Sequence, residues 1–108
     1  MKLIMSIVNN DDANRVQDAL IDSGFFVTRM SSTGGFLKKG NTTFLIGTND
    51  DKVNTVIEVI KKHANKRVIK EPTVSSSQMG EAFTPIMVDV LVGGATIFVL
   101  DIERFEKL

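Results

Sequence analysis

The segment that most constrains the fold is a helix-period pattern between residues 53 and 64. Its apolar residues recur at i, i+3, i+4, i+7 and i+11, which places them in one stripe along an α-helix. They are Val53, Val56, Ile57, Ile60 and Ala64. Asn49 is of the type that caps helix N-termini, and Lys61 and Lys62 suit the negative end of the helix dipole. The pattern therefore predicts a helix that packs by one face.

A second helical pattern runs from about Asp11 to Ser23, and Gly24 after it is a natural C-terminal stop. Short segments rich in apolar and β-branched residues surround the two helices and predict strands. These segments are Leu3–Val8, Phe25–Ser32, Thr42–Gly47, Ile86–Val92 and Ala95–Leu100. Gly93-Gly94, between the last two, is predicted to be a tight hairpin turn.

This order predicts an α+β, ferredoxin-like (βαββαβ) fold, with two helices on one face of an antiparallel sheet. Ile86–Val92 is expected to complete the sheet, and Ala95–Leu100 to add an extra C-terminal β-hairpin strand. Residues 68–85 are predicted to form a long loop. The strands are apolar on both faces, so we expect another copy of the chain to cover the open face. The 108 residues suit one domain, residues 1–108.

Composition excludes several functional classes. Thirteen basic residues balance thirteen acidic ones, so no net field draws the chain to nucleic acid or to a membrane. There is no cysteine, which excludes disulfides and thiolate chemistry. The apolar start, residues 1–5, is too short for a signal peptide or a membrane span. We expect a soluble cytoplasmic protein.

The sequence shows no catalytic or metal-binding constellation. His63 is the only histidine, and no acidic cluster lies close to it in sequence. Asp11-Asp12 and Asp50-Asp51 stand at predicted helix starts, where acids are expected for capping and for the dipole. We therefore expect no enzyme, no metal and no cofactor. A hydrolytic or metal-dependent enzyme remains the alternative from another class.

Residues 33–47 carry the clearest indication of binding. The glycines and the asparagine suit a turn, because both residue types tolerate positive φ. A turn does not require Phe36 and Leu37 at its tip. Apolar groups on a glycine-rich loop beside Asn and Thr side chains suit a flat, partly polar ligand. A loop that folds back onto its own core is the alternative interpretation.

This stretch, Thr33–Phe44, and the later Val92–Val99 resemble the PII-like cyclic di-AMP receptor family (PstA/DarA). The opening Met1–Ile4 and the helix start Asn49–Val53 resemble it too. The resemblance implies a cytoplasmic homotrimer that binds cyclic di-AMP in clefts between subunits. Ligand would order the long loop and so signal to an unidentified downstream protein. A PII-like module that binds another nucleotide, such as ATP, is the alternative.

The resemblance also assigns residues to the adenine of the ligand. Gly35, Phe36 and Leu37 would frame the base. Asn41 would read its edge, because a carboxamide presents a donor and an acceptor that match adenine N6 and N7. Phe98 would supply a stacking wall.

Further residues are assigned to the phosphates. Thr28 and the backbone at Val27 would contact phosphate, and Gly47 would let the ligand approach the main chain. Relatives often have Arg where this chain has Phe26. This difference implies that one phosphate contact is either missing or supplied by Arg29 or a lysine instead.

Overall fold

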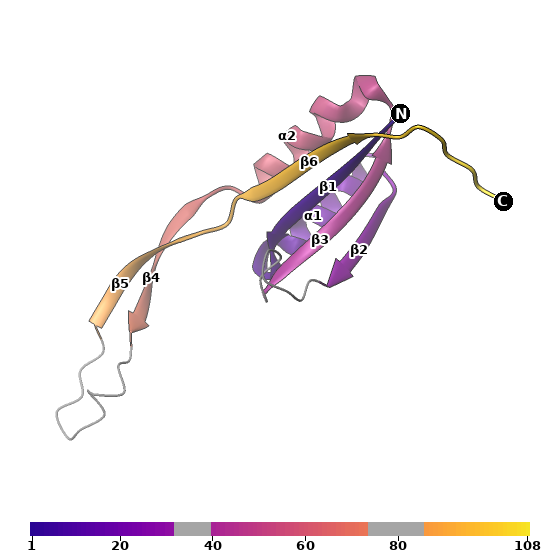
Figure 1. The fold of residues 1–108 in the computed structure, drawn as a ribbon. Coiled ribbons are helices and arrows are strands. Elements are labelled where there is room, and N and C mark those ends of the chain that lie inside the picture. Colours follow the sequence, from indigo (N-terminus) through magenta and orange to yellow (C-terminus); the bar gives the residue numbers. More distant parts are fainter. Residues whose placement is uncertain (32–39, 74–85) are drawn as a thin grey trace.

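The structure is a computed structural model that describes residues 1–31, 40–73 and 86–108. Its elements follow in order. They are β1 (Lys2–Asn9), α1 (Asn10–Asp22), β2 (Val27–Ser31), β3 (Asn41–Thr48), the 3-10 turn η1 (Asp50–Lys52), α2 (Val53–His63), β4 (Arg67–Thr73), β5 (Ile86–Val92) and β6 (Ala95–Asp101). Four strands form one antiparallel sheet in the order β2-β3-β1-β6, and both helices lie on one face of it (Figure 1). This α+β arrangement is consistent with the predicted ferredoxin-like fold.

We call this sheet and its two helices the body. Its core lies between the helices and the sheet face turned toward them. The core side chains come from every layer and are at most 1% exposed: Ile4, Val8, Ala13, Val16, Leu20, Phe44, Ile46, Val56, Ile60 and Ala64. The two helical periods predicted from the sequence supply about half of them, so both helix predictions are confirmed.

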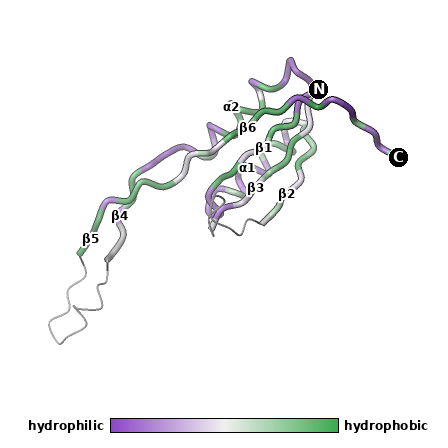
Figure 2. The backbone as a smooth tube through the Cα atoms, viewed as in Figure 1, coloured by the Kyte–Doolittle hydropathy of each residue, from purple (hydrophilic) through white to green (hydrophobic). Residues whose placement is uncertain are grey.

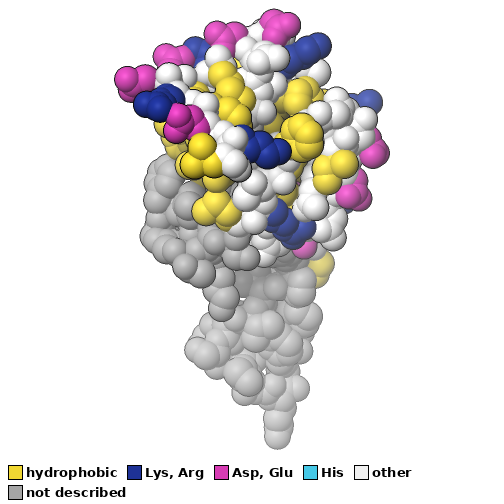
Figure 3. All heavy atoms as spheres, turned by 90° about the vertical axis from the view of Figure 1, so that its right-hand side faces the viewer, with side chains coloured by type: hydrophobic (Ala, Val, Ile, Leu, Met, Phe, Trp, Pro, Cys, Tyr) yellow, Lys and Arg dark blue, Asp and Glu magenta, His cyan; other side chains and the backbone are white. Residues whose placement is uncertain are grey.

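The other face of the sheet is the open face. Alternation along the strands gives it Leu3, Met5, Leu45, Phe98 and Leu100, which the pairing register sets side by side. Phe98 is 40% exposed and Leu100 45%. Seen from the end where the C-terminus emerges, hydrophobic side chains reach the described surface between acidic and basic ones (Figure 3). The prediction that the strands are apolar on both faces is confirmed.

We call the antiparallel pair β4–β5 the arm. It projects from the body, so that the molecule measures 64 × 25 × 18 Å (Figure 1). β5 is as apolar as the strands of the sheet, whereas β4 carries several charged residues (Figure 2). Even so, Val68 is 62% exposed, Met87 55% and Leu91 63%. A two-stranded ribbon is marginally stable by itself. The contacts where the arm joins the body are therefore needed to hold it in place.

Three predictions about the C-terminal half are wrong. β6 pairs with β1, with Val99 opposite Ile4, so β6 rather than β5 completes the sheet. β5 pairs with β4, with Val90 opposite Ile69, so Gly93-Gly94 joins arm to body and is no hairpin turn. The predicted loop 68–85 begins later, because residues 67–73 form β4; residues 74–85 lie outside the described residues. β5 and β6 have similar sequences, and pairing depends on which strand edges the tertiary fold leaves available.

Candidate functional site

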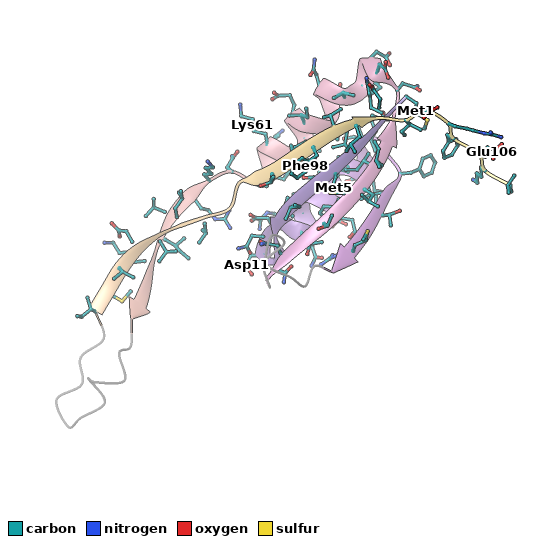
Figure 4. All side chains as sticks on the ribbon, in the orientation of Figure 1. Met1, Met5, Asp11, Lys61, Phe98 and Glu106 are labelled. Carbon is teal, nitrogen blue, oxygen red and sulfur yellow. The ribbon has the colours of Figure 1, made fainter. Side chains whose placement is uncertain are left out.

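Part of the predicted ligand set lies in one row on the open face. Thr28 on β2 is opposite Leu45 on β3, and Leu45 is opposite Met5 on β1. Met5 is in turn opposite Phe98 on β6, and Figure 4 shows these two side by side. The row crosses all four strands, so Thr28 and Phe98 stand at opposite edges of the same surface. An apolar floor with a hydroxyl at one edge and an aromatic ring at the other suits a flat ligand.

Asn41 and Gly47 alternate with Leu45 along β3 and therefore share the open face. They stand near the two ends of the strand, about 20 Å apart at roughly 3.3 Å per residue. One chain thus places its predicted ligand residues in two groups, separated along the strand.

Two other predicted residues belong to the helix-covered side. Val27 is opposite Ile46, and its side chain packs against the core rather than on the open face. Arg29 Nη1 donates to Asn14 Oδ1 at 2.8 Å and to Gln17 Oε1 at 3.2 Å, both on α1. The structure therefore does not bring the Arg29 guanidinium to the face that carries Thr28. Gly35, Phe36 and Leu37 lie outside the described residues.

A hollow of about 410 Å³ lies where the end of β3 meets the start of α2, and Gly47 is in its wall. Phe26, which is 90% exposed, and Lys52 line the same hollow. The Met1 ammonium also lines it but is engaged with Asp50 Oδ1 at 2.9 Å. This hydrogen bond lowers the pKa of the Asp50 carboxyl. Lys52 is therefore the cation in this wall best placed for an anionic ligand.

Lys52 was not singled out from the sequence. The available signal was its place in the helix start Asn49–Val53, one of the segments that resembles the receptor family. Gly47 has room for a side chain: a Cβ there would meet Met1 Cε at 3.7 Å, an ordinary van der Waals contact. The ligand-free chain thus does not require glycine at this position, which fits a role in ligand approach.

The first turn of α1 fixes both neighbours of Asn41. Asn10 N donates to Gly40 O at 2.9 Å, and Thr42 Oγ1 donates to Asn10 Oδ1 at 2.6 Å. Thr42 is 3% exposed and Asn10 is exposed, so this side-chain bond is partly buried. The backbone that presents Asn41 is therefore held by the helix start as well as by the strand ladder.

The interpretation of Asp11-Asp12 as a helix-capping pair needs correction at Asp12. The cap is Asn9, whose Oδ1 accepts from Asp11 N at 2.8 Å. Asp12 is fully buried and accepts from Arg15 Nη2 at 2.5 Å and from Arg67 Nη2 at 2.9 Å. The sequence held a signal, because Asp12 precedes Val16 and Leu20 at four-residue intervals on the buried stripe of α1.

Two further observations concern the described parts of the chain. Within residues 1–31, 40–73 and 86–108, no three acidic or histidine side chains gather as they would around a metal ion. Over the same ranges, no helix has the length and apolarity needed to cross a membrane.

Comparison with known proteins completes the description. Residues 1–108 match the family described as cyclic-di-AMP receptor. A "nitrogen fixation nifHD region GlnB-like protein 1" from Methanothermococcus thermolithotrophicus is 31% identical over 97 residues, covering 78% of this chain and 92% of that protein. A protein of unknown function from Pediococcus pentosaceus, known from its crystal structure, superposes with a TM-score of 0.73 at 41% identity, covering 99% of this chain and 96% of that one.

Proposed function

This chain belongs to the cyclic-di-AMP receptor family, and we propose that it is a non-enzymatic, cytoplasmic signalling protein of PII type that binds cyclic di-AMP. The family match over the whole chain carries the proposal. The placement of Thr28, Asn41, Gly47 and Phe98 on one face of the sheet supports it. The protein uses no metal and no cofactor, and its output is a contact with a downstream protein.

Asn41 is proposed to select adenine. Its carboxamide can donate to N7 and accept from the N6 amino group. Guanine has a carbonyl oxygen at the same place, so a buried polar group would stay unpaired at a cost of roughly 1–3 kcal/mol. Because 1.4 kcal/mol corresponds to tenfold in affinity, cyclic di-GMP should bind at least about tenfold more weakly than cyclic di-AMP.

The phosphates are proposed to meet Thr28 and Lys52. Arg29 is engaged by two side chains of α1 and would have to give up both bonds to reach them. Lys52 lines the hollow that contains Gly47 and needs no such rearrangement. As a point charge, a lysine can take the place of the arginine that relatives often have at the position of Phe26, without bidentate geometry.

A homotrimer is proposed as the assembly, with the ligand between neighbouring chains. The open face carries exposed Met30, Phe98 and Leu100, which a second copy would remove from water. The ligand residues share this face, so they would lie at or beside the contact. Occupancy would then be reported through the arm, which projects away from the sheet.

Isothermal titration with cyclic di-AMP, cyclic di-GMP and ATP, with and without Mg²⁺, tests the proposed ligand. We expect strong binding of cyclic di-AMP alone, independent of metal, and a trimer mass by light scattering. Preference for ATP would favour the alternative of a PII-like module for another nucleotide. A monomer mass would remove the site between chains.

Gly47→Ala is the single substitution that best separates an effect on ligand binding from an effect on stability. The ligand-free chain has room for the added methyl, so its melting temperature should stay within a few degrees of wild type. Cyclic di-AMP should bind about tenfold or more weakly if the ligand approaches the main chain here. Unchanged binding would show that Gly47 lies outside the site.

A further inference from the structure

We propose that Asp12 is a positioning residue that couples the ligand-reading end of β3 to the base of the arm through the first turn of α1. The identity of the ligand rests on the proposed function above. The connection itself consists of contacts within the chain and can be tested without ligand.

One end of the connection lies beside Asn41. The residues on either side of it, Gly40 and Thr42, are each bonded to Asn10, through a backbone carbonyl at 2.9 Å and a hydroxyl at 2.6 Å. A ligand that shifts Asn41 must shift one or both of these bonds. Asn10 is the first residue of α1, so the shift acts on the start of the helix.

The other end lies at the base of the arm. Arg67 is the first residue of β4, and its guanidinium reaches both carboxylate oxygens of Asp12, at 2.9 Å from Nη2 to Oδ1 and 3.4 Å from Nη1 to Oδ2. Nη1 also donates to Asn65 O at 3.2 Å. Gly93 closes over this cluster: a Cβ there would lie 2.8 Å from Arg67 Nη1. Gly94 N donates to Ala64 O at 2.5 Å.

Both strands of the arm therefore leave the body at one cluster, and Asp12 is the residue of α1 within it. Arg67 is opposite Val92, the last residue of β5 before the glycine pair. A change in the angle of the arm must move the Arg67 guanidinium relative to Asp12. Because Asp12 is fully buried, water cannot replace Arg67, and Arg15 Nη2, at 2.5 Å from Oδ1, would be left as the charged partner. The Asp12–Arg67 pair therefore favours one arrangement of the arm over its neighbours.

The two ends meet within less than one helical turn. Asn10 and Asp12 are two residues apart, and a turn holds 3.6. Peptide geometry transmits a displacement of one to the other without loose side chains between them. The helix start thus links the backbone at Asn41 to the direction of the arm, which is a contiguous path of bonded groups.

Hydrogen exchange followed by mass spectrometry on the ligand-free protein tests the connection. Asp12→Asn keeps the shape of the side chain but removes its charge. We expect faster exchange in β4 and β5, and also at residues 40–42. Asp11→Asn is the matched control: it removes a charge from the same turn of α1, but Asp11 is exposed and outside the cluster. It should leave exchange in the arm unchanged.

Asp12 is buried, so its substitution could itself disturb folding. Two further variants test the same connection at other residues, and a third serves as their control. Arg67→Gln removes the partner that is only half-buried and should loosen the arm in the same way. Thr42→Val, on β3, removes the hydroxyl that donates to Asn10 of α1, and it should also raise hydrogen exchange in the arm. Thr48→Val, at the far end of the same strand, should not. An arm indifferent to both Asp12→Asn and Thr42→Val overturns the inference.

Titration with cyclic di-AMP separates this inference from the proposed function. If wild type binds, Asp12→Asn should bind about fivefold or more weakly, at the lower end of typical coupling between sites, and Asp11→Asn should bind as wild type does. Equal affinities of wild type and Asp12→Asn would contradict the coupling. If wild type does not bind but Thr42→Val still loosens the arm, the connection stands and cyclic di-AMP is not what it responds to.

Discussion

The apolar residues of the body and those of the arm reach opposite states of burial. In the body, Phe44 and Ile46 of β3 are fully buried between sheet and helices. In the arm, Val68 and Leu91 face each other across the ribbon and stay more than 60% exposed. The difference is one layer: two helices cover the sheet, and the described residues place nothing over the arm.

The stability of the body and the direction of the arm therefore depend on different interactions. Burial of apolar surface stabilises the body at about 25 cal/mol per Å². The arm gains little of this term, so a few polar contacts at its base set its direction. A segment held in this way can change direction by rearranging those few contacts without unpacking the core, which suits the proposed role as a reporter of ligand occupancy. The predictions below test this separation, from the largest expected effect to the smallest.

Truncation in the two regions should differ most. Phe44→Ala removes the largest fully buried side chain of the described residues and should lower the free energy of unfolding by roughly 3–5 kcal/mol. Leu91→Ala, in the arm, should change it by less than about 0.5 kcal/mol. Urea unfolding at one fixed protein concentration measures both. Similar losses would mean that the arm is buried in the assembled protein and belongs to its stable core.

At Gly93, in the junction between arm and body, an added side chain should destabilise the protein more than it does at Gly24, in an ordinary turn. Gly93 has φ +83°, and a Cβ there would collide with the carbonyl oxygen of Asn65. Gly24 has φ +90°, with nothing among the described residues within 4 Å of such a Cβ. Gly24→Ala should cost about 1–2 kcal/mol for the left-handed backbone alone. Gly93→Ala should cost more and should also speed hydrogen exchange in the arm; equal costs would leave the junction without a special role.

Removal of one buried polar group in the body should change stability by a smaller amount and should raise it. The Ser6 hydroxyl is buried and has no hydrogen-bond partner among the described residues. Ser6→Ala should therefore stabilise the protein by about 1 kcal/mol, since an unsatisfied buried group costs about 1–3. Thermal unfolding of the two proteins decides. A loss of stability would show that the hydroxyl has a hydrogen-bond partner in the folded protein.

The smallest effect is expected on the surface of the arm. Lys70 Nζ lies 3.3 Å from Asp89 Oδ1 across the two strands, and both side chains are about two-thirds or more exposed. Lys70→Gln should cost less than about 1 kcal/mol, because water and salt screen the pair. Hydrogen exchange at low and high salt would show it. A large loss of protection in the arm would mean that this pair, rather than the junction, holds the ribbon together.

The sequence alone was sufficient for the helices and for most strands. The apolar spacing from Val53 to Ala64 predicted α2, and the stripe that includes Val16 and Leu20 predicted α1, because helical periodicity is a local property. It was not sufficient for pairing. β5 and β6 read alike, and which of them lies beside β1 depends on contacts between distant segments.

The site divides in the same way. Family resemblance assigned Asn41 and Gly47 to a ligand, and the structure, in which β3 runs from Asn41 to Thr48, places both on one face. The place of Lys52 in the hollow depends on several separate elements that meet there. The contact of Asp12 with Arg67 joins residues 55 positions apart in the sequence. Local pattern fixes which residues can be buried or can bind. Only the tertiary structure decides which of them meet, because burial and charge pairing are properties of neighbours in space.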